Sequence, residues 1–285
     1  MNVYEVELPA QFGSLRQLDR LSGDAINYRR RKPVHVDLHE VTFIRPLAVV
    51  GIVQFLETMI RRGRPVRVSF PSHPRILNYL VAIGLPDMMN RLGTWAWPEG
   101  FPIEAPQGLR PVIRLTSFAG SEEVETISQQ MQDVFTNDSI LPVSLSAPCY
   151  QVFAELADNV VNHAKSSGYV LAQRYEYKEG PVIDIAIGDC GIGVRRSLFQ
   201  NRMLRPKLTD DSAALRLAMK DGVTRVPDEY RGYGLGYVRS ELSSPGRKLV
   251  VRSGTAIAVW HEGRPVRVYD CKAFVGTLAH AIIPC

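Results

Sequence analysis

Hydrophobic and polar positions follow recognisable patterns along the first third of the chain. Residues 34–38 (VHVDL) and 65–70 (PVRVSF) alternate as strands do, and residues 46–61 between them repeat apolar side chains at helical spacing. Gly63 is typical of the end of such a helix. We therefore predict a βαβ unit, with a further helix at residues 74–83 lying on its sheet.

The later part of the chain combines longer helical and alternating stretches. Helices are expected to begin at Ser121 and at Ser146, because each serine precedes apolar residues at helical spacing. A further helix is expected at residues 212–220. Four alternating runs predict strands, at residues 169–177, 182–187, 248–260 and 266–283. Antiparallel strands that follow a long helix would form an α/β sandwich with helices on one face.

The two patterned regions are separated by a segment rich in proline. Residues 98–111 hold four prolines and little periodic apolar sequence, which is typical of a connection between domains. A chain of 285 residues is long enough for two hydrophobic cores. The sequence therefore predicts two α/β domains, residues 1–105 and 106–285, with a linker at about 98–118.

The composition is that of an ordinary globular protein, with 45% hydrophobic and 22% charged residues. The net charge of +5 is spread along the chain, and no helix-turn-helix or aromatic-interleaved basic patch favours nucleic acid. The four cysteines lack metal-binding spacing and are expected to be reduced thiols. Without a signal-peptide pattern or the roughly 18 apolar residues of a membrane helix, we expect a cytoplasmic protein.

Candidate chemistry begins in the segment ELADNVVNHA, which starts at Glu155. On an α-helix, Glu155, Asn159 and Asn162 fall within an arc of about 60°, opposite an apolar stripe. The amide oxygen of Asn159 is a hard ligand suited to Mg²⁺, and Glu155 could orient an attacking water. A solvated helix face explains the same pattern.

Two glycine-containing motifs follow. Asp189 ends a predicted strand and precedes Gly191 and Gly193, so its carboxylate could accept a hydrogen bond from a base edge that the glycines allow to approach closely. A surface turn would explain this motif equally well. Later, the glycine-spaced turn at residues 232–236 opens a helix, where free backbone N–H groups suit anionic oxygen. By itself that spacing is a weak signal.

In this order, and with the Gly276-Thr277 pair on the last strand, the motifs resemble the GHKL ATP-binding fold. Type II topoisomerases, MutL, sensor histidine kinases and anti-sigma-factor kinases share this fold, and ELADNVVNHA is most similar to the anti-sigma-factor kinase form. The resemblance covers residues 145–285. It implies a Bergerat α/β sandwich, in which a mixed sheet is covered by helices on one face.

The resemblance implies a role for each motif position. Glu155 would be the general base that activates water or a protein hydroxyl, Asn159 would hold Mg²⁺ between the phosphates, and Asp189 would bind the adenine amino group. Gly191 and Gly193 would line the adenine pocket.

Further roles follow for the end of the chain. Thr277 would support Asp189 or its bound water. Residues 194–230, which are rich in basic side chains, would be the mobile ATP lid. The backbone that wraps the phosphates would belong to Gly232, Tyr233, Gly234, Leu235 and Gly236.

The chain departs from the sensor-kinase pattern at Asn162, where those enzymes often carry a lysine or an arginine. A cation for the phosphates would then come from the lid, with Arg231 or Arg195 as candidates, although a solvated arginine explains either position. His163 could bind the ribose or the phosphates, or could simply lie at the boundary of the helix face.

The first region, residues 30–90, resembles the STAS domain of bacterial anti-sigma-factor antagonists in its apolar pattern. In many of these antagonists an Asp-Ser-Ser-Gly turn opens the helix and carries the phosphorylated serine. Here the matching positions are Arg45, Pro46, Leu47 and Ala48. Because none has a hydroxyl group, this turn is not expected to be phosphorylated, and the STAS-like module would serve docking or dimerisation.

Together these patterns predict a regulatory ATPase switch of the GHKL class that binds ATP and Mg²⁺ and controls partner contacts through its STAS-like domain. Two alternatives stay open. One is a protein serine kinase of anti-sigma-factor type that acts on a separate STAS partner, and the other is a non-catalytic, nucleotide-dependent binding module. The expected partner is a protein, either of STAS type or a second copy of this chain, and neither a membrane nor nucleic acid is expected.

Overall fold

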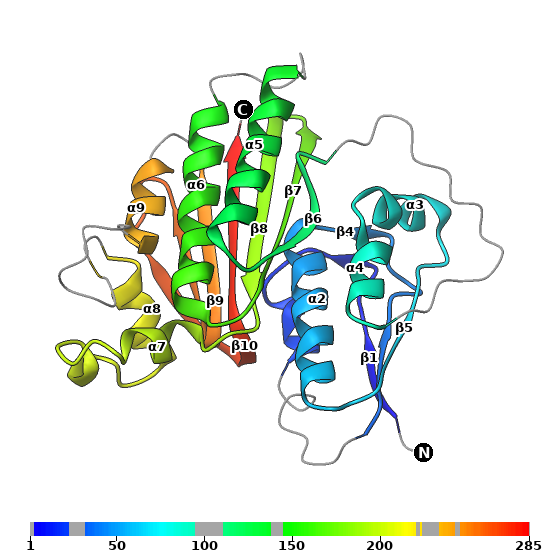
Figure 1. Cartoon of the computed structure of the whole chain (residues 1–285), viewed down its shortest axis with the longest axis horizontal. Coiled ribbons are helices and arrows are strands. Elements are labelled where there is room, and N and C mark those ends of the chain that lie inside the picture. Colours follow the sequence, from blue (N-terminus) through cyan, green and yellow to red (C-terminus); the bar gives the residue numbers. More distant parts are fainter. Residues whose placement is uncertain are drawn as a thin grey trace.

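The computed structural model describes residues 3–22, 32–94, 111–137, 145–220, 223, 234–242 and 246–284. Within these ranges the chain is an α/β protein whose strands form sheets of three, five and two strands (Figure 1). No helix in the described ranges is long and apolar enough to cross a membrane.

The first part of the chain builds a parallel sheet beside one long helix. Strands β1 (Tyr4–Glu7), β3 (Val34–Asp37) and β5 (Val66–Ser69) pair in parallel, with β3 in the centre. Helix α2 (Pro46–Arg61) connects β3 to β5, as the predicted βαβ unit requires. Its first residue is a proline, which lacks an N–H group and suits the first turn of a helix.

Helix α3 (Pro74–Ala82) agrees with the predicted helix at residues 74–83. Shorter elements complete this part, and the hydrophobic pattern did not predict them: β2 (Gln11–Phe12), η1 (Gln17–Leu21), β4 (Phe43–Ile44) and α4 (Leu85–Arg91). Strands β2 and β4 form a two-stranded parallel pair. Elements of two to seven residues are too short for a repeating pattern to become visible.

A second, five-stranded sheet occupies the rest of the structure in the order β6-β7-β8-β10-β9. Its strands are β6 (Ile113–Phe118), β7 (Gly168–Tyr177), β8 (Gly180–Asp189), β9 (Lys248–His261) and β10 (Arg267–Pro284). All four neighbouring pairs are antiparallel, so the expectation of a mixed sheet is wrong. Short turns join β7 to β8 and β9 to β10, and such turns permit only antiparallel pairing.

Strand β6 lies inside the segment expected as a linker, residues 98–118. It pairs with β7, so this end of the expected linker is part of the sheet. The remainder, residues 98–110, falls outside the described ranges.

Several helices accompany the five-stranded sheet. They are α5 (Ser121–Asn137), α6 (Ser146–Asn159), α7 (Gly193–Leu198), α8 (Asp211–Ala218), α9 (Gly234–Glu241) and the short 3-10 turn η4 (Arg205–Lys207). Helices α5 and α6 begin at the two predicted serines, and α6 continues into a π-helical turn, η3 (Val160–Ala164). Both long helices lie on one face of the sheet (Figure 1).

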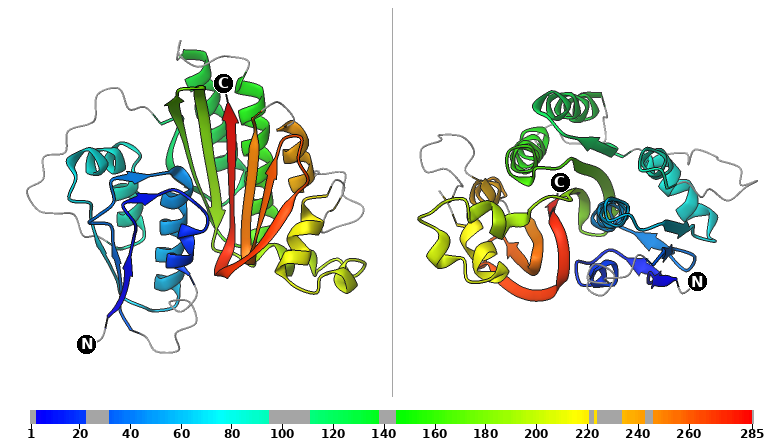
Figure 2. Two further views of the ribbon diagram at one scale, coloured as in Figure 1. Left: turned by 180° about the vertical axis from the view of Figure 1, so that it is seen from behind. Right: turned by 60° about the horizontal axis from the view of Figure 1, so that its bottom comes forward.

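Helix α2 covers the opposite face of the five-stranded sheet, which was expected to carry no helix (Figure 2). Strand β8 shows the division, because Ile185 and Ile187 belong to the core under α5 and α6 whereas Ala186 belongs to the core around α2. All side chains from Pro46 to Met59 are buried, as is typical of a helix enclosed on all sides. The expectation that helices cover only one face is therefore wrong, because α2 lies between the three-stranded sheet and the five-stranded sheet.

Candidate functional site

Polar side chains gather at one end of the five-stranded sheet, on the face covered by α6. Asp189 ends β8, and the register places Thr277 of β10 opposite it and Ser253 of β9 next to Thr277. The hydroxyl oxygens of Ser253 and Thr277 are 3.4 Å apart. We call Asp189, Thr277 and Ser253 the polar row. Residues two positions further along each strand contribute to the core under α6, so the row lies on that same face.

Asp189 is buried, and several donors hold its carboxylate. The backbone N–H of Gly191 donates to its Oδ1 over 2.7 Å, and Thr277 donates from both its backbone N–H and its hydroxyl group. Burial is the dominant effect and raises the pKa of Asp189 to about 7, although these hydrogen bonds act in the opposite direction. The structure thus places Thr277 directly against Asp189.

The loop after β8 packs closely on the end of α6. A Cβ atom at Gly191 would overlap the carbonyl oxygen of Ala164, the last residue of η3, and only glycine avoids this overlap. The same carbonyl accepts a hydrogen bond from the backbone N–H of Ile192 over 3.0 Å. At Gly193 the backbone adopts a φ of 74°, a conformation that favours glycine. Both predicted glycines therefore shape the contact between this loop and η3.

The predicted polar stripe on α6 is only partly present. Glu155 and Asn159 are half-buried, and the Nδ2 group of Asn159 donates to the main-chain oxygen of Glu155 over 2.7 Å. Asn162 is exposed and His163 is half-buried, both within the π-helical turn. Because η3 does not follow α-helical spacing, the predicted arc does not extend to Asn162.

The glycine-spaced motif is described only in its helical half. Gly234, Leu235 and Gly236 open α9, and Leu235 is buried in the core that α9 shares with α6. The other predicted residues of this motif, Arg231, Gly232 and Tyr233, fall outside the described part of the chain.

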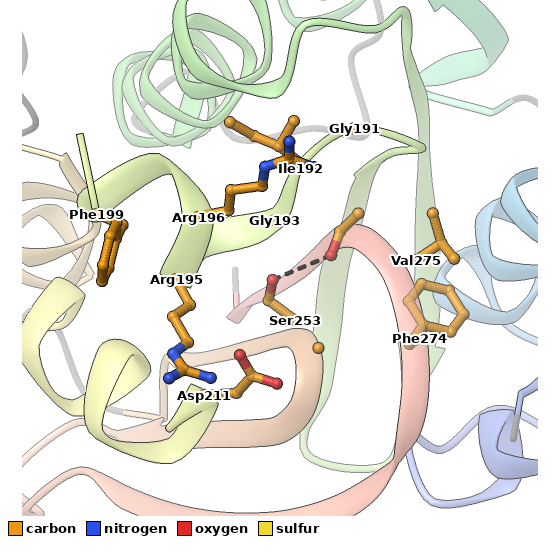
Figure 3. A pocket seen from close by; sticks show the side chains of 12 residues that line it. Gly191, Ile192, Gly193, Arg195, Arg196, Phe199, Asp211, Ser253, Phe274 and Val275 are labelled. Atoms are coloured by element: carbon orange, nitrogen blue, oxygen red, sulfur yellow. Dashed lines mark hydrogen bonds between the residues drawn. The ribbon is translucent and has the colours of Figure 1, made fainter. Parts of the chain in front are cut away.

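A cavity of about 420 Å³ adjoins the polar row (Figure 3). Its lining residues come from the loop after β8, from α7 and α8, and from the β9–β10 hairpin: Gly191, Ile192, Gly193, Arg195, Arg196, Phe199, Asp211, Ser253, Gly254, Phe274, Val275 and Gly276. Three of these, Gly191, Gly193 and Arg195, were named as candidates from the sequence. The cavity therefore lies at the glycine loop, whereas the predicted residues Asp189, Thr277, Glu155 and Asn159 are not part of its lining.

Ser253 joins the walls of this cavity. Its hydroxyl group donates to the main-chain oxygen of Gly276 over 3.0 Å (Figure 3). It also accepts a hydrogen bond from the backbone N–H of Val194 over 2.9 Å. Ser253 was not among the predicted site residues. A signal was present, because the alternation of β9 places it on the same face as Leu249 and Val251, where an apolar residue is expected.

Two of the charged side chains at the cavity, Arg195 and Asp211, hold its walls. Arg195 donates to the carbonyl oxygens of Leu208 and Thr209, over 3.2 and 2.6 Å, and so fixes the segment before α8. Asp211 accepts from the backbone N–H and the hydroxyl group of Thr255. The structure therefore uses Arg195, a candidate phosphate ligand, to position the wall of the cavity.

No match to this chain was found among protein-family models or among curated proteins. The chemistry of the site therefore follows from its own geometry. Its features are a buried carboxylate, two neighbouring hydroxyl groups, a tight glycine loop and the polar end of α6.

Proposed function

We propose that this chain binds ATP with Mg²⁺ and acts as an ATPase switch of the GHKL class. The observation that carries the proposal is the position of Asp189. Its buried carboxylate lies at the end of a strand beneath α6 and is hydrogen-bonded to Gly191, which lines the cavity, and to Thr277. Asp189 and Thr277 lie 88 positions apart in the sequence, and their contact supports the pairing that the resemblance implies.

The surroundings of Asp189 support recognition of an adenine amino group. An N–H donor from the base would add a hydrogen bond to the carboxylate, and such a bond favours the ionised form of the acid. With a pKa of about 7, the carboxyl group of Asp189 changes its charge easily near neutral pH. Binding of the base would therefore draw this group toward its ionised state.

The end of α6 supports the phosphate and metal part of the proposal. Because the Nδ2 group of Asn159 is used within the helix, its amide oxygen is the atom that remains for Mg²⁺. In the described ranges no group of three or more His, Cys, Asp or Glu side chains could hold a metal, so most other ligands would be phosphate and water oxygens. Bound Mg²⁺ would neutralise phosphate charge, while Glu155, one turn before Asn159, would accept the proton of the attacking water.

The first part of the chain would respond to the nucleotide through its buried helix, α2. Helix α2 is buried between the two sheets, so its surface is not open to a separate partner. In this proposal the nucleotide state reaches the STAS-like part through the contact of α2 with the five-stranded sheet. Partner proteins would then bind to other surfaces of that part.

The experiment measures phosphate release from Mg-ATP and binding of a fluorescent ATP analogue in the same samples. The wild type is compared with Glu155→Ala, with Asp189→Ala and with Asp158→Ala, which removes an exposed carboxylate from the same helix. We expect Glu155→Ala to stop turnover and keep binding, Asp189→Ala to lose binding, and Asp158→Ala to resemble the wild type.

Other outcomes select a different function. Transfer of label from ATP to an added STAS-type protein would indicate the serine kinase, whereas binding without turnover in the wild type would indicate the binding module. A wild-type protein that binds no adenine nucleotide, or an Asp189→Ala variant that binds it as well as the wild type, would overturn the site.

A further inference from the structure

Buried polar side chains interrupt the apolar length of α2 at Gln54, Glu57 and Thr58, and Gln54 is the most deeply buried of the three. Gln54 lies at the centre of this helix and is only 1% exposed. Its Nε2 group donates to the main-chain oxygen of Asp189 over 2.5 Å and to that of Thr277 over 3.0 Å. A single amide group from the first part of the chain thus holds the end of β8 to the middle of β10, directly behind the polar row.

The five-stranded sheet is shaped to receive this amide group. A Cβ atom at Gly188 would overlap Oε1 of Gln54, so glycine at this position leaves room for the side chain. Cys190 points toward the same helix, and its thiol donates to the main-chain oxygen of Gln54 over 3.3 Å. Neighbouring residues therefore face opposite ways, with Asp189 toward α6 and Cys190 toward α2.

Gln54 reduces the stability of the fold, which a purely structural contact would not require. Its Oε1 atom is buried and finds no hydrogen-bond partner among the described residues. A buried acceptor without a partner costs roughly 1–3 kcal/mol. An apolar side chain would avoid that cost but would leave the carbonyl oxygens of Asp189 and Thr277 without this donor.

We propose that Gln54 is a positioning residue for adenine recognition, an inference that rests on the proposed binding of ATP. Asp189 is the last residue of β8, and the pairing of β10 with β9 shifts register next to Thr277. The pairing of β8 with β10 ends at Asp189 and Thr277, so the backbone of these two residues needs another support. Gln54 supplies it and thereby fixes where the carboxylate of Asp189 meets the base.

The test compares two nucleotides that differ by one group, namely ATP and purine ribonucleoside triphosphate, which lacks the 6-amino group. Dissociation constants are measured for the wild type, for Gln54→Leu and for Gln54→Met, which keeps nearly the length of the side chain but has no hydrogen-bond donor. We expect each change to weaken ATP binding about tenfold while the affinity for the analogue changes little. The preference for ATP is the informative quantity, because partial unfolding would lower both affinities equally.

Arg45→Gln provides a matched control at the other end of the same interface. Arg45 precedes α2 and contacts Tyr177 and Asp184, far along the strands from Asp189. This variant should loosen the contact between α2 and the sheet without changing the preference for ATP.

The outcomes separate the two proposals. An unchanged preference in both Gln54 variants, or an equal loss of preference in Arg45→Gln, overturns the positioning role of Gln54 and leaves the nucleotide site standing. A wild-type protein that binds ATP and the analogue equally well overturns the assignment of Asp189 and the role of Gln54 together.

Discussion

At the scale of single residues, Asp189 shows how burial and hydrogen bonding act in opposite directions on one carboxyl group. Burial disfavours its charge, whereas donors from Gly191 and Thr277 favour it, and burial dominates. A carboxyl group with a pKa of about 7 costs stability when it is ionised. Such a cost is reasonable at a site where a ligand supplies the missing donor.

This conflict predicts a pH dependence of stability. The pKa of Asp189 is raised from 3.8 to about 7, so the folded chain binds more protons than the unfolded chain between these values. The contribution of Asp189 to the free energy of unfolding is therefore full below pH 4 and is lost as pH rises to 7, by up to roughly 1.4 kcal/mol per unit. In Asp189→Asn this dependence should disappear.

Urea unfolding of both proteins between pH 4 and pH 8 measures the difference. Subtracting the Asp189→Asn curve from the wild-type curve removes the contributions of all other titrating groups. A difference that stays constant over this range would show that Asp189 titrates at its ordinary value.

At the scale of elements, the contact between the glycine loop and η3 sets the shape of the site. In Gly191→Ala the new Cβ atom would overlap the carbonyl oxygen of Ala164, and a backbone atom cannot move away as a flexible side chain does. We expect the free energy of unfolding to fall by about 1–3 kcal/mol and the affinity for ATP to fall with it.

Gly63→Ala is the control for this change. Gly63 follows α2, has a φ of 67° and has open space where a Cβ atom would lie. The alanine should cost about 1 kcal/mol through its backbone conformation alone and leave ATP affinity unchanged. Denaturant unfolding and nucleotide titration of both variants measure the two effects, and equal affinities in the two variants would contradict the role of the loop.

Long elements could be predicted from the sequence because their periods repeat several times. Helices α2 and α6 and strands β7 to β10 were recognisable for this reason. The π-helical turn η3 could not be predicted, because the prediction assumes α-helical spacing throughout. That spacing placed Asn162 on the same helix face as Glu155 and Asn159, and η3 does not follow it. Strand β6 was missed because it follows a proline-rich segment and alternates over only four residues, Ile113 to Thr116.

The site was only partly predictable, because some of its residues meet only in the folded structure. Motif order indicated Asp189, Gly191, Gly193 and Thr277, which the structure brings together. The alternation of β9 indicates the face on which Ser253 lies, but its place beside Thr277 depends on the register of β9 against β10, which no local pattern reveals. Gln54 was missed because apolar residues at helical spacing predict the helix but do not show that it lies against the five-stranded sheet.

At the scale of the whole molecule, both parts of the chain contribute to one hydrophobic core. The cluster around α2 includes Val36 of the parallel sheet and Leu171 and Leu278 of the five-stranded sheet. A polar contact ties the parts together as well. Arg252 of β9 is fully buried, and it pairs with Asp19 of η1 over 2.5 Å.

This shared core predicts that the chain unfolds as one unit. In Asp19→Asn, Arg252 would remain buried with its charge uncompensated, although it keeps its bonds to the carbonyl oxygens of Leu15 and Lys272. Because Asp19 is 31% exposed, we expect a loss of about 2 kcal/mol rather than the full cost of breaking a buried pair. Asp87→Asn, which removes an exposed partner of Arg114, should change stability by less than about 1 kcal/mol.

Hydrogen exchange measured strand by strand tests this expectation. If the parts unfold together, Asp19→Asn should accelerate exchange in β3 and in β8 by the same factor, because both then exchange through the same global opening. A saturating nucleotide should slow exchange in both strands equally, since a ligand stabilises every residue that unfolds with its site. Faster exchange in β3 alone would instead show that the parallel sheet opens independently, and the contact of α2 would then be too weak to transmit the nucleotide state.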